Sequence, residues 1–285
     1  MDMRSRPYRS VLYIPGSKDR ALEKARGLPV DAIIFDLEDA VAVDEKPAAR
    51  ETLKAALAAG GYGARVRIVR INGLDTEWGR ADAEAVARMD CDAVLLPKVE
   101  SAAQLDALAK ITGDLPIWAM METPKGMLNA AEIAAHPKMA GMVMGTNDLA
   151  KELQTRFRAD RLPLLTSLSM CLLAAKAEGL VIVDGVYNAF KDDEGLKAEC
   201  TQGRDMGFDG KTLIYPAQVD IANIAYAPAP EEIDLARRQI EAFDEMQATG
   251  QGVAVVDGRI VENLHVASAR ETLAKLDAIA ALQTE

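Results

Sequence analysis

Two acidic residues in the middle of the chain, Glu122 and Asp148, lie at positions suited to binding a metal ion. Glu122 directly follows the apolar run Ile117–Met121, and Asp148 follows the run Met142–Met144 after a short turn. An amphipathic helical pattern separates the two runs, so the order predicts strand, helix, strand, with a carboxylate at the carboxyl end of each strand. In a parallel α/β sheet these ends meet at the edge where ligands bind.

Two carboxylates that meet at such an edge suit a hard divalent cation such as Mg²⁺, because no cysteine or histidine adjoins either of them in the sequence. A structural alternative fits the spacing equally well: Glu122 caps the following helix, and Asp148 is an ordinary loop residue. The spacing alone leaves both interpretations open.

Eight short apolar runs alternate with amphipathic helical patterns along the chain. They are Val11–Ile14, Ala32–Phe35, Val66–Ile71, Ala93–Leu96, Ile117–Met121, Met142–Met144, Leu180–Val183 and Lys211–Tyr215. Both faces of most runs are apolar, as in strands buried within a parallel sheet. Eight such units in about 220 residues predict an α/β fold of the (β/α)₈ TIM-barrel type. The alternative is a doubly wound open sheet, but Pro15-Gly16-Ser17 is a poor match for the glycine-rich phosphate turn of that fold.

A barrel would collect polar side chains at one mouth. Those at or just past the ends of the predicted strands are Glu38, Asp39, Arg70, Asn72, Lys98, Glu122, Asn147, Asp148 and Asp184. Gathered together, the carboxylates suit a cation, and Arg70 suits a substrate carboxylate because its planar guanidinium can form two hydrogen bonds with it. On the surface of a helix the same charges would be ordinary solvated groups.

The chain continues for about 70 residues after the predicted barrel, which is too short for a separate stable core. A long amphipathic helix over Glu231–Thr249 leads to two apolar runs around Asp257-Gly258, which predict a hairpin, and a final helix follows over His265–Leu282. We therefore expect a barrel domain of residues 1–227. Residues 228–285 should form a helix-hairpin-helix lid that packs on its own barrel or on that of a neighbouring subunit. A lid over a barrel mouth excludes water and can supply a catalytic group.

The composition of the chain limits the kinds of partner and the location that we expect for the protein. The 285 residues carry a formal net charge of −11 without a compensating basic tract, which argues against nucleic acid or an anionic membrane surface as a partner. The three cysteines lack metal-binding spacing and are expected to be reduced thiols. We see neither a signal peptide nor an apolar run long enough to cross a bilayer, so a cytoplasmic location is expected.

Six motifs, in this order, carry a resemblance to a known family: R-S-V-L-Y-I-P-G-S, D-L-E-D-A-V-A-V-D-E-K, R-I-N-G, L-P-K-V-E, M-E-T-P-K-G and G-T-N-D-L-A. They resemble the citrate lyase β-subunit-like (HpcH/HpaI aldolase/citrate lyase) family of Mg²⁺-dependent acyl-CoA enzymes. The resemblance covers nearly the whole chain. It implies a TIM barrel with a C-terminal lid, a homotrimer or homohexamer, a small acyl-CoA substrate, and Mg²⁺ as cofactor, with Mn²⁺ as an alternative.

The resemblance also implies roles for particular residues. Glu122 and Asp148 match the metal ligands, and Arg70 matches the arginine that holds the substrate carboxylate or carbonyl. The positions that match contacts to the acyl group or to coenzyme A are Asn147, Asp148, Tyr13, Lys18, Lys24, Ile214 and Tyr215. Many relatives have histidine where this chain has Tyr215, so a role that needs an imidazole in those relatives cannot be assigned to Tyr215.

Glu262, in the predicted lid, is the second departure from the family pattern. Lyases of the family carry an aspartate at this place that reaches the active site of a neighbouring subunit. The glutamate is one methylene longer, which changes what the carboxylate can deprotonate, because a general base must lie within hydrogen-bond reach. Glu262 is therefore a candidate catalytic residue, with an ordinary surface glutamate as the structural alternative.

The tail V-A-V-V-D-G-R-I-V-E-N-L-H is most similar to the branch of the family that hydrolyses (3S)-malyl-CoA. We therefore expect hydrolysis of (3S)-malyl-CoA, or a close 3-hydroxyacyl-CoA, to malate and CoA. The first alternative is carbon–carbon cleavage of malyl-CoA or citramalyl-CoA to acetyl-CoA plus glyoxylate or pyruvate. The second is a non-catalytic acyl-CoA-binding subunit. The hydrolase and the lyase use the same predicted residues, so the sequence separates them weakly. A binding subunit would tolerate loss of the metal pair, but this chain retains both Glu122 and Asp148.

Overall fold

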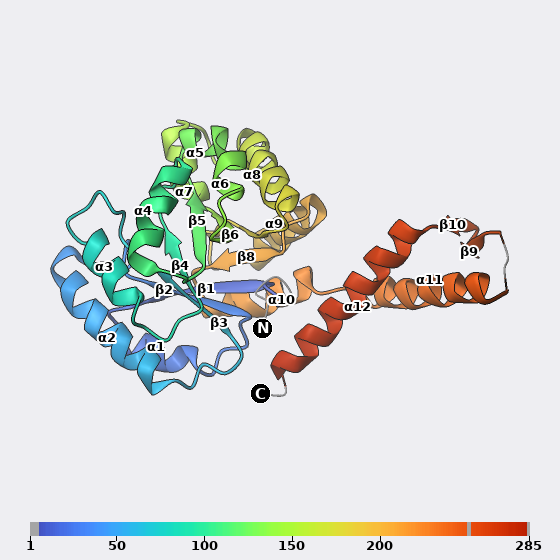
Figure 1. Ribbon diagram of the computed structural model, residues 1–285, viewed down its shortest axis with the longest axis horizontal. Coiled ribbons are helices and arrows are strands. Elements are labelled where there is room, and N and C mark those ends of the chain that lie inside the picture. The colour runs from blue at the N-terminus through green and yellow to red at the C-terminus, as the bar shows by residue number, and fades with distance from the viewer. Residues whose placement is uncertain (1–5, 250–251, 284–285) are drawn as a thin grey trace. The chain divides into compact units, whose positions relative to one another are not determined.

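The structure is a computed structural model that describes residues 6–249 and 252–283. Eight parallel strands close into a barrel in sequence order, with β8 paired to β1 (Figure 1). The strands are β1 (Ser10–Pro15), β2 (Ala32–Asp36), β3 (Val66–Arg70), β4 (Ala93–Leu96), β5 (Ile117–Met121), β6 (Met139–Met144), β7 (Val181–Asp184) and β8 (Gly210–Leu213). The predicted TIM barrel is confirmed, and the open-sheet alternative is wrong.

Helices surround the strands (Figure 1). The α-helices of this part are α1 (Asp19–Ala25), α2 (Lys46–Ala59), α3 (Gly79–Val86), α4 (Ala102–Thr112), α5 (Pro124–Leu128), α6 (Ala130–Ala134), α7 (Thr146–Glu152), α8 (Leu165–Ala177), α9 (Asp193–Met206) and α10 (Val219–Tyr226). Short 3₁₀ turns lie at η2 (Val43–Glu45), η3 (Leu162–Leu164) and η4 (Pro216–Gln218). Local signals fix several boundaries: α4 begins with a capping box of Ser101 and Gln104 and ends at Gly113, which has φ 63°.

The core lies on both sides of the strands. Every residue of β2 and β5 is buried, as expected for strands with side chains facing the barrel interior on one side and the helices on the other. The largest buried side chain, Trp118 of β5, packs against Gly141 of β6. A Cβ at Gly141 would lie 2.5 Å from the indole, so only glycine fits between these strands.

The segment between β5 and β6 differs from the single predicted helix. It forms two short helices, α5 and α6, that meet at Asn129. The Asn129 side chain donates a hydrogen bond of 2.7 Å to the carbonyl oxygen of Glu100, and its backbone leaves the helical region with ψ 11°. This side-chain bond to a neighbouring loop competes with helix continuation. The short helices α7 and α10 were also not predicted.

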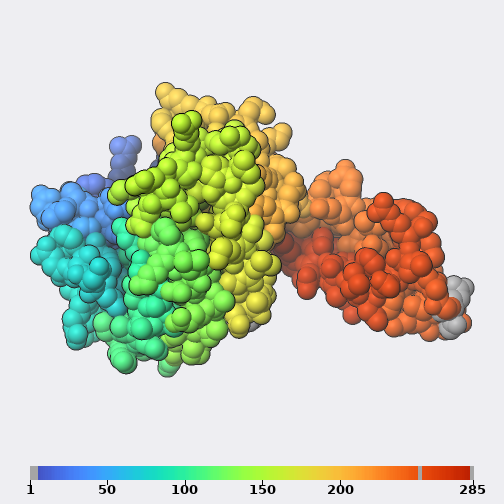
Figure 2. All heavy atoms as spheres, turned by 90° about the horizontal axis from the view of Figure 1, so that it is seen from above, coloured from blue at the N-terminus to red at the C-terminus, as the bar shows by residue number. Residues whose placement is uncertain are grey.

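A second compact unit begins at Ala227, and the first covers Tyr8–Tyr226. It contains α11 (Pro230–Thr249), the antiparallel strands β9 (Ala254–Val256) and β10 (Arg259–Val261), and α12 (Asn263–Gln283). The helices α11 and α12 pack against each other. Figure 2 shows the atoms of this unit in orange and red. The predicted hairpin is confirmed: Asp257 and Gly258 have φ of 48° and 74°, as in the tight turns of two-residue hairpins.

The hairpin has a small core and an apolar surface. Phe243, Ala254, Val261 and Val266 are buried together. In contrast, the exposed apolar side chains of this region are Val253, Val255, Ile260 and Leu264. None of the described helices of the chain is both long and apolar enough to cross a membrane.

Candidate active site

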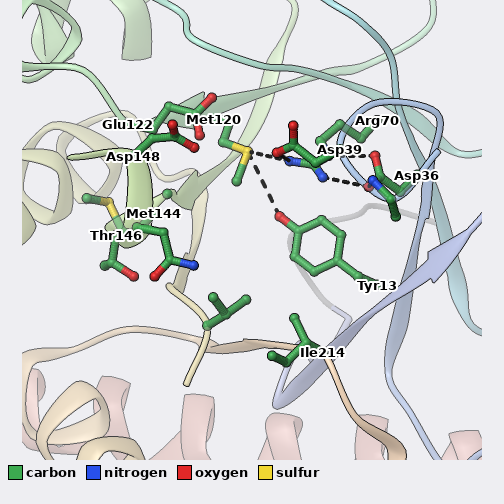
Figure 3. A pocket seen from close by; sticks show the side chains of 14 residues that line it. Tyr13, Asp36, Asp39, Arg70, Met120, Glu122, Met144, Thr146, Asp148 and Ile214 are labelled. Carbon is green, nitrogen blue, oxygen red and sulfur yellow. Dashed lines mark hydrogen bonds and ion pairs between the residues drawn. The ribbon is translucent and has the colours of Figure 1, made fainter. Parts of the chain in front are cut away.

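A cavity of about 290 Å³ opens at the carboxyl ends of the barrel strands. Its walls come from β1, β2, β3, β5 and β6 and from the segments that follow β2, β5, β6, β7 and β8. The residues with predicted roles that it brings together are Tyr13, Arg70, Glu122, Asn147, Asp148 and Ile214. Figure 3 labels all of them except Asn147. The cavity thus combines two carboxylates, a guanidinium, a phenol and an amide in one place.

Glu122 is a buried carboxylate, with 2% of its surface exposed. It follows β5 directly, and the backbone N–H of Lys98 donates a hydrogen bond of 2.8 Å to its Oε1. Lys98 has φ 50°, a left-handed conformation that is uncommon for a residue with a side chain and that often marks functional sites. Burial, together with the charge of Glu38, raises the pKa of Glu122 to about 8.

Asp148 lies in the first turn of α7 and is half-buried. Its charge acts on Glu122, and the two carboxylates lie side by side on one wall of the cavity (Figure 3). Gly145 makes this approach possible. A Cβ there would lie 2.4 Å from Cβ and 2.5 Å from Oε2 of Glu122, so any other residue at position 145 would displace the carboxylate.

The donor set fits a divalent cation. The ionised form of Glu122 is disfavoured by burial and by the neighbouring carboxylates Glu38 and Asp148, and a cation would compensate this charge. Within residues 6–249 and 252–283, no group of three or more histidine, cysteine, aspartate or glutamate side chains is arranged around a metal position. Mg²⁺ binds through one or two carboxylates and retains several waters, so Glu122 and Asp148 suffice. The oxygen-only ligands also match Mg²⁺ or Mn²⁺ rather than a soft metal.

Arg70, the last residue of β3, lies on the opposite wall and is held by acidic side chains. Its Nε and Nη2 donate bonds of 2.7 and 2.6 Å to the two oxygens of Asp36, and its Nη1 lies 2.9 Å from Oε2 of Glu38. Burial acts to lower the pKa of Arg70, but the charge and hydrogen bonds of Asp36, together with the neighbouring Tyr13 and Glu38, raise that pKa well above its usual value. The guanidinium is therefore a fixed cation in the cavity.

Tyr13 of β1 lies beside this cation. The Arg70 guanidinium carbon is 5.0 Å from the centre of the Tyr13 ring, and the Tyr13 hydroxyl points to the sulfur of Met120 at 3.9 Å (Figure 3). Burial raises the pKa of Tyr13, so the phenol is neutral at ordinary pH. The neutral hydroxyl can donate a hydrogen bond to a bound oxygen atom.

Four of the residues with predicted roles do not line the cavity within the described part of the chain. Lys18 precedes α1 and forms an exposed ion pair of 2.9 Å with Glu45, and Lys24 is exposed on α1. Tyr215 is half-exposed beyond Ile214. Glu262 belongs to the C-terminal unit, where it is exposed and accepts the first backbone hydrogen bonds of α12.

Two residues predicted at the mouth point elsewhere. Asp184 ends β7, yet it is fully buried between Arg161 and Lys211, with Nη1 of Arg161 at 2.6 Å and Nζ of Lys211 at 3.2 Å. Asn72 is buried and bonded to Lys46 and Asp82. Both were expected among the mouth residues, and both are structural. The direction of the side chain at a strand end depends on which face of the sheet that position occupies, and the barrel register decides this.

Asp36 and Met120 are functional candidates that sequence reasoning missed. Asp36 ends β2 directly opposite Arg70 in the strand register, and it also accepts hydrogen bonds of 2.9 Å from the backbone of Glu38 and Ala40. It is therefore the residue that positions Arg70. The D-L-E-D motif could have indicated this role for Asp36. Asp36 is the first acid of the motif and the last residue of the strand, whereas the other two acids lie beyond the strand.

Comparisons with known proteins agree with this architecture. The model of the family described as HpcH/HpaI aldolase/citrate lyase matches residues 9–216. The chain is 68% identical over 283 residues to a (3S)-malyl-CoA thioesterase from Cereibacter sphaeroides, covering 99% of both chains. It is 34% identical over 286 residues to citrate lyase subunit beta from Escherichia coli, covering 96% of this chain and 95% of the relative.

Among solved structures, it resembles protein CitE from Mycobacterium tuberculosis in complex with magnesium, acetoacetate and coenzyme A. The TM-score is 0.79 and the identity 32%, over 96% of this chain and 99% of the other. The family match extends over the barrel strands and the loops that carry the cavity residues. The chain belongs to the HpcH/HpaI aldolase/citrate lyase family.

Proposed function

We propose that this protein is a Mg²⁺-dependent thioesterase that hydrolyses (3S)-malyl-CoA, or a close 3-hydroxyacyl-CoA, to malate and CoA. The observation that carries the proposal is the 68% identity to (3S)-malyl-CoA thioesterase over 99% of both chains. The cavity supports it, since it places a carboxylate pair opposite an arginine in a volume of about 290 Å³. That volume suits a small dicarboxylic acyl group.

The metal would be held by Glu122 and Asp148, and when bound it supplies a Lewis acid for the oxygens of the acyl group. Arg70 binds the substrate carboxylate through the edge that carries Nη1, because Asp36 already occupies Nε and Nη2. Glu38, whose pKa burial raises to about 7, can give up its contact with Nη1 in a protonated form. Tyr13 and the Asn147 amide can donate hydrogen bonds to the acyl oxygens.

Hydrolysis also needs a base that activates water, and we propose Glu262 for this role. The family pattern supports it, because lyases carry a shorter acid at the same place. The exposed apolar side chains around the hairpin, such as Val255 and Ile260, are suited to pack on another subunit. We therefore propose that residues 228–285 close over the active site of a neighbouring subunit in a homotrimer or homohexamer, in the cytoplasm.

One observation favours a second candidate function. The chain shares 34% identity with citrate lyase subunit beta, and the neighbour of known structure is named for its complex with acetoacetate and coenzyme A. Carbon–carbon cleavage of malyl-CoA to acetyl-CoA and glyoxylate would use the same carboxylate pair and Arg70. In that reaction Arg70 would stabilise the enolate that becomes acetyl-CoA, and a cation held by Glu122 and Asp148 would supply further positive charge.

Product analysis separates the two reactions. Purified protein is incubated with malyl-CoA and Mg²⁺, and free thiol and glyoxylate are followed in the same tube. The proposal expects free CoA and malate without glyoxylate. Glyoxylate and acetyl-CoA without free thiol would establish the lyase instead, and the absence of all products would point to a binding subunit or another acyl group.

A further inference from the structure

Met120 of β5 lies between the two charged walls of the cavity (Figure 3). The carboxylates of Glu122 and Asp148 are on one side of it, and Arg70 is on the other. The next residue of the strand, Met121, does not line the cavity and is fully buried in the core. Because successive side chains of a strand point to opposite faces of the sheet, β5 directs one methionine into the cavity and the other towards the helices.

The sulfur of Met120 contacts two hydrogen-bond donors of the site. It lies 3.6 Å from Nη1 of Arg70 and 3.9 Å from the hydroxyl oxygen of Tyr13. A thioether is only a weak acceptor, so an oxygen atom of a ligand would form a stronger hydrogen bond with either donor. Met120 therefore lies directly beside the atoms that are best placed to bind substrate oxygens.

Met120 has little room to move aside for a larger ligand. Methionine side chains are usually flexible, but this one is only 6% exposed, and its neighbours in the cavity are fixed. Asp36 holds Arg70 through hydrogen bonds of 2.7 and 2.6 Å. The guanidinium of Arg70 in turn lies 5.0 Å from the centre of the Tyr13 ring. The side chain of Met120 is thus a firm part of the cavity wall.

The proposed binding mode determines which part of the acyl group would face Met120. In that mode the substrate carboxylate binds Nη1 of Arg70, and the acyl oxygens reach towards Glu122 and Asp148. The carbon that carries the hydroxyl group in malyl-CoA is bonded directly to this carboxylate. It would therefore lie between the two walls, next to the Met120 side chain. A methyl branch on this carbon would need space that Met120 occupies.

We propose that Met120 determines the specificity of the site for the acyl group. It admits the unbranched malyl group and excludes acyl groups with a methyl branch on the hydroxyl-bearing carbon, as in citramalyl-CoA. The inference rests on the proposed function for its binding mode, and it names the class of acyl group that the site accepts.

The test compares the two acyl groups on the same proteins. We expect Met120→Ala to raise the ratio of kcat/KM for citramalyl-CoA to kcat/KM for malyl-CoA at least about tenfold. One carbon group in an apolar pocket contributes about 10–200-fold to discrimination between substrates. Met120→Leu, which nearly keeps the side-chain volume, should retain the wild-type ratio. Chromatography follows the consumption of each acyl-CoA, so the ratio is obtained for a hydrolase and for a lyase alike.

Met121→Ala is the matched control. It makes the same truncation one residue further along β5, on the face that packs against the helices. Thermal melts should show a loss of stability, because the truncation leaves a cavity in the core. The ratio of the two kcat/KM values should nevertheless stay at the wild-type value, since the wall of the cavity is intact.

An unchanged ratio in Met120→Ala, or an equal rise in Met121→Ala, would overturn the inference. So would a wild-type protein that consumes both esters equally well. If the wild type consumes neither ester, the proposed function fails, and calorimetry with malate and citramalate in the presence of Mg²⁺ tests Met120 separately. Met120→Ala should then improve the affinity for citramalate relative to malate. Equal relative affinities in the two proteins, or no binding of either acid, would contradict the assigned role.

Discussion

Glu122 is the residue on which the chemistry of the cavity depends. A buried carboxylate next to two other acids is unfavourable unless a cation or a proton compensates it, and burial with the charge of Glu38 raises the pKa of Glu122 to about 8. Asp148 offers the second carboxylate at the same wall. At the scale of single residues, the protein therefore stores an electrostatic cost that metal binding relieves.

Replacing this charge should affect activity and stability in opposite directions. We expect Glu122→Gln to lower turnover at least about 100-fold, because loss of one ligand removes several kcal/mol of transition-state stabilisation. In EDTA above about pH 8, the same variant should melt at or above the temperature of the wild type, since it removes a buried carboxylate that is then ionised and uncompensated. Thermal melts with and without Mg²⁺ check this: Mg²⁺ should raise the melting temperature of the wild type alone. A variant that melts far below the wild type in EDTA would contradict the argument.

Asp36 acts on the substrate only through Arg70. Replacing Asp36 should therefore show how much the fixed orientation of Arg70 contributes to substrate binding. Asp36→Asn removes the charge from a pair in which Asp36 is 1% and Arg70 6% exposed. Breaking a buried ion pair costs about 3–5 kcal/mol, so urea unfolding should show a loss of that order. KM for malyl-CoA should rise more than kcat falls, because Arg70 keeps its charge but loses its fixed orientation. Unchanged KM would argue that Asp36 is structural only.

At the scale of elements, the turn between β6 and α7 determines the metal site. Gly145→Ala would place a Cβ 2.4 Å from Cβ of Glu122, which is itself buried and has little room to move. We expect activity to fall at least about tenfold, together with the stabilisation of the protein by Mg²⁺ in thermal melts. Gly113→Ala is the matched control: Gly113 has φ 63°, and no heavy atom lies within 4 Å of the position that a Cβ would take there. It should cost about 1–3 kcal/mol of stability, because φ 63° with ψ −124° strains a residue that has a Cβ, and leave activity intact.

The elements themselves could largely be predicted from the sequence. The strands were recognisable because both of their faces are apolar, and β4 and β5 begin and end where predicted. The metal pair could be proposed because each acid follows a strand. The roles of Asp36 and Asp184 were predicted less well, although both residues end a strand. Asp36 faces the cavity, whereas Asp184 faces α9. That difference depends on the register of neighbouring strands around the closed barrel, which a single sequence does not determine.

At the scale of the whole molecule, the proposal requires two chains for each active site. Glu122 and Glu262 would then act together from different subunits. Glu122→Gln and Glu262→Ala should each be inactive alone, while mixing the unfolded variants and refolding them together should restore part of the activity. In a trimer, some sites then combine an intact metal pair with an intact lid. Chromatography with light scattering checks that both variants keep the wild-type assembly. No recovery in mixed assemblies of normal size would contradict a lid supplied by a neighbour.

The fate of solvent oxygen distinguishes thioester hydrolysis from carbon–carbon cleavage. Malyl-CoA is incubated with the protein and Mg²⁺ in water enriched in oxygen-18, and the released malate is analysed by mass spectrometry. A thioesterase at this site predicts malate with one heavy oxygen in the carboxylate that was bound to sulfur, formed in equal amount to free CoA and abolished in Glu122→Gln. Unlabelled acetyl-CoA with glyoxylate, and no labelled malate, would show that the same carboxylates and Arg70 serve carbon–carbon cleavage instead.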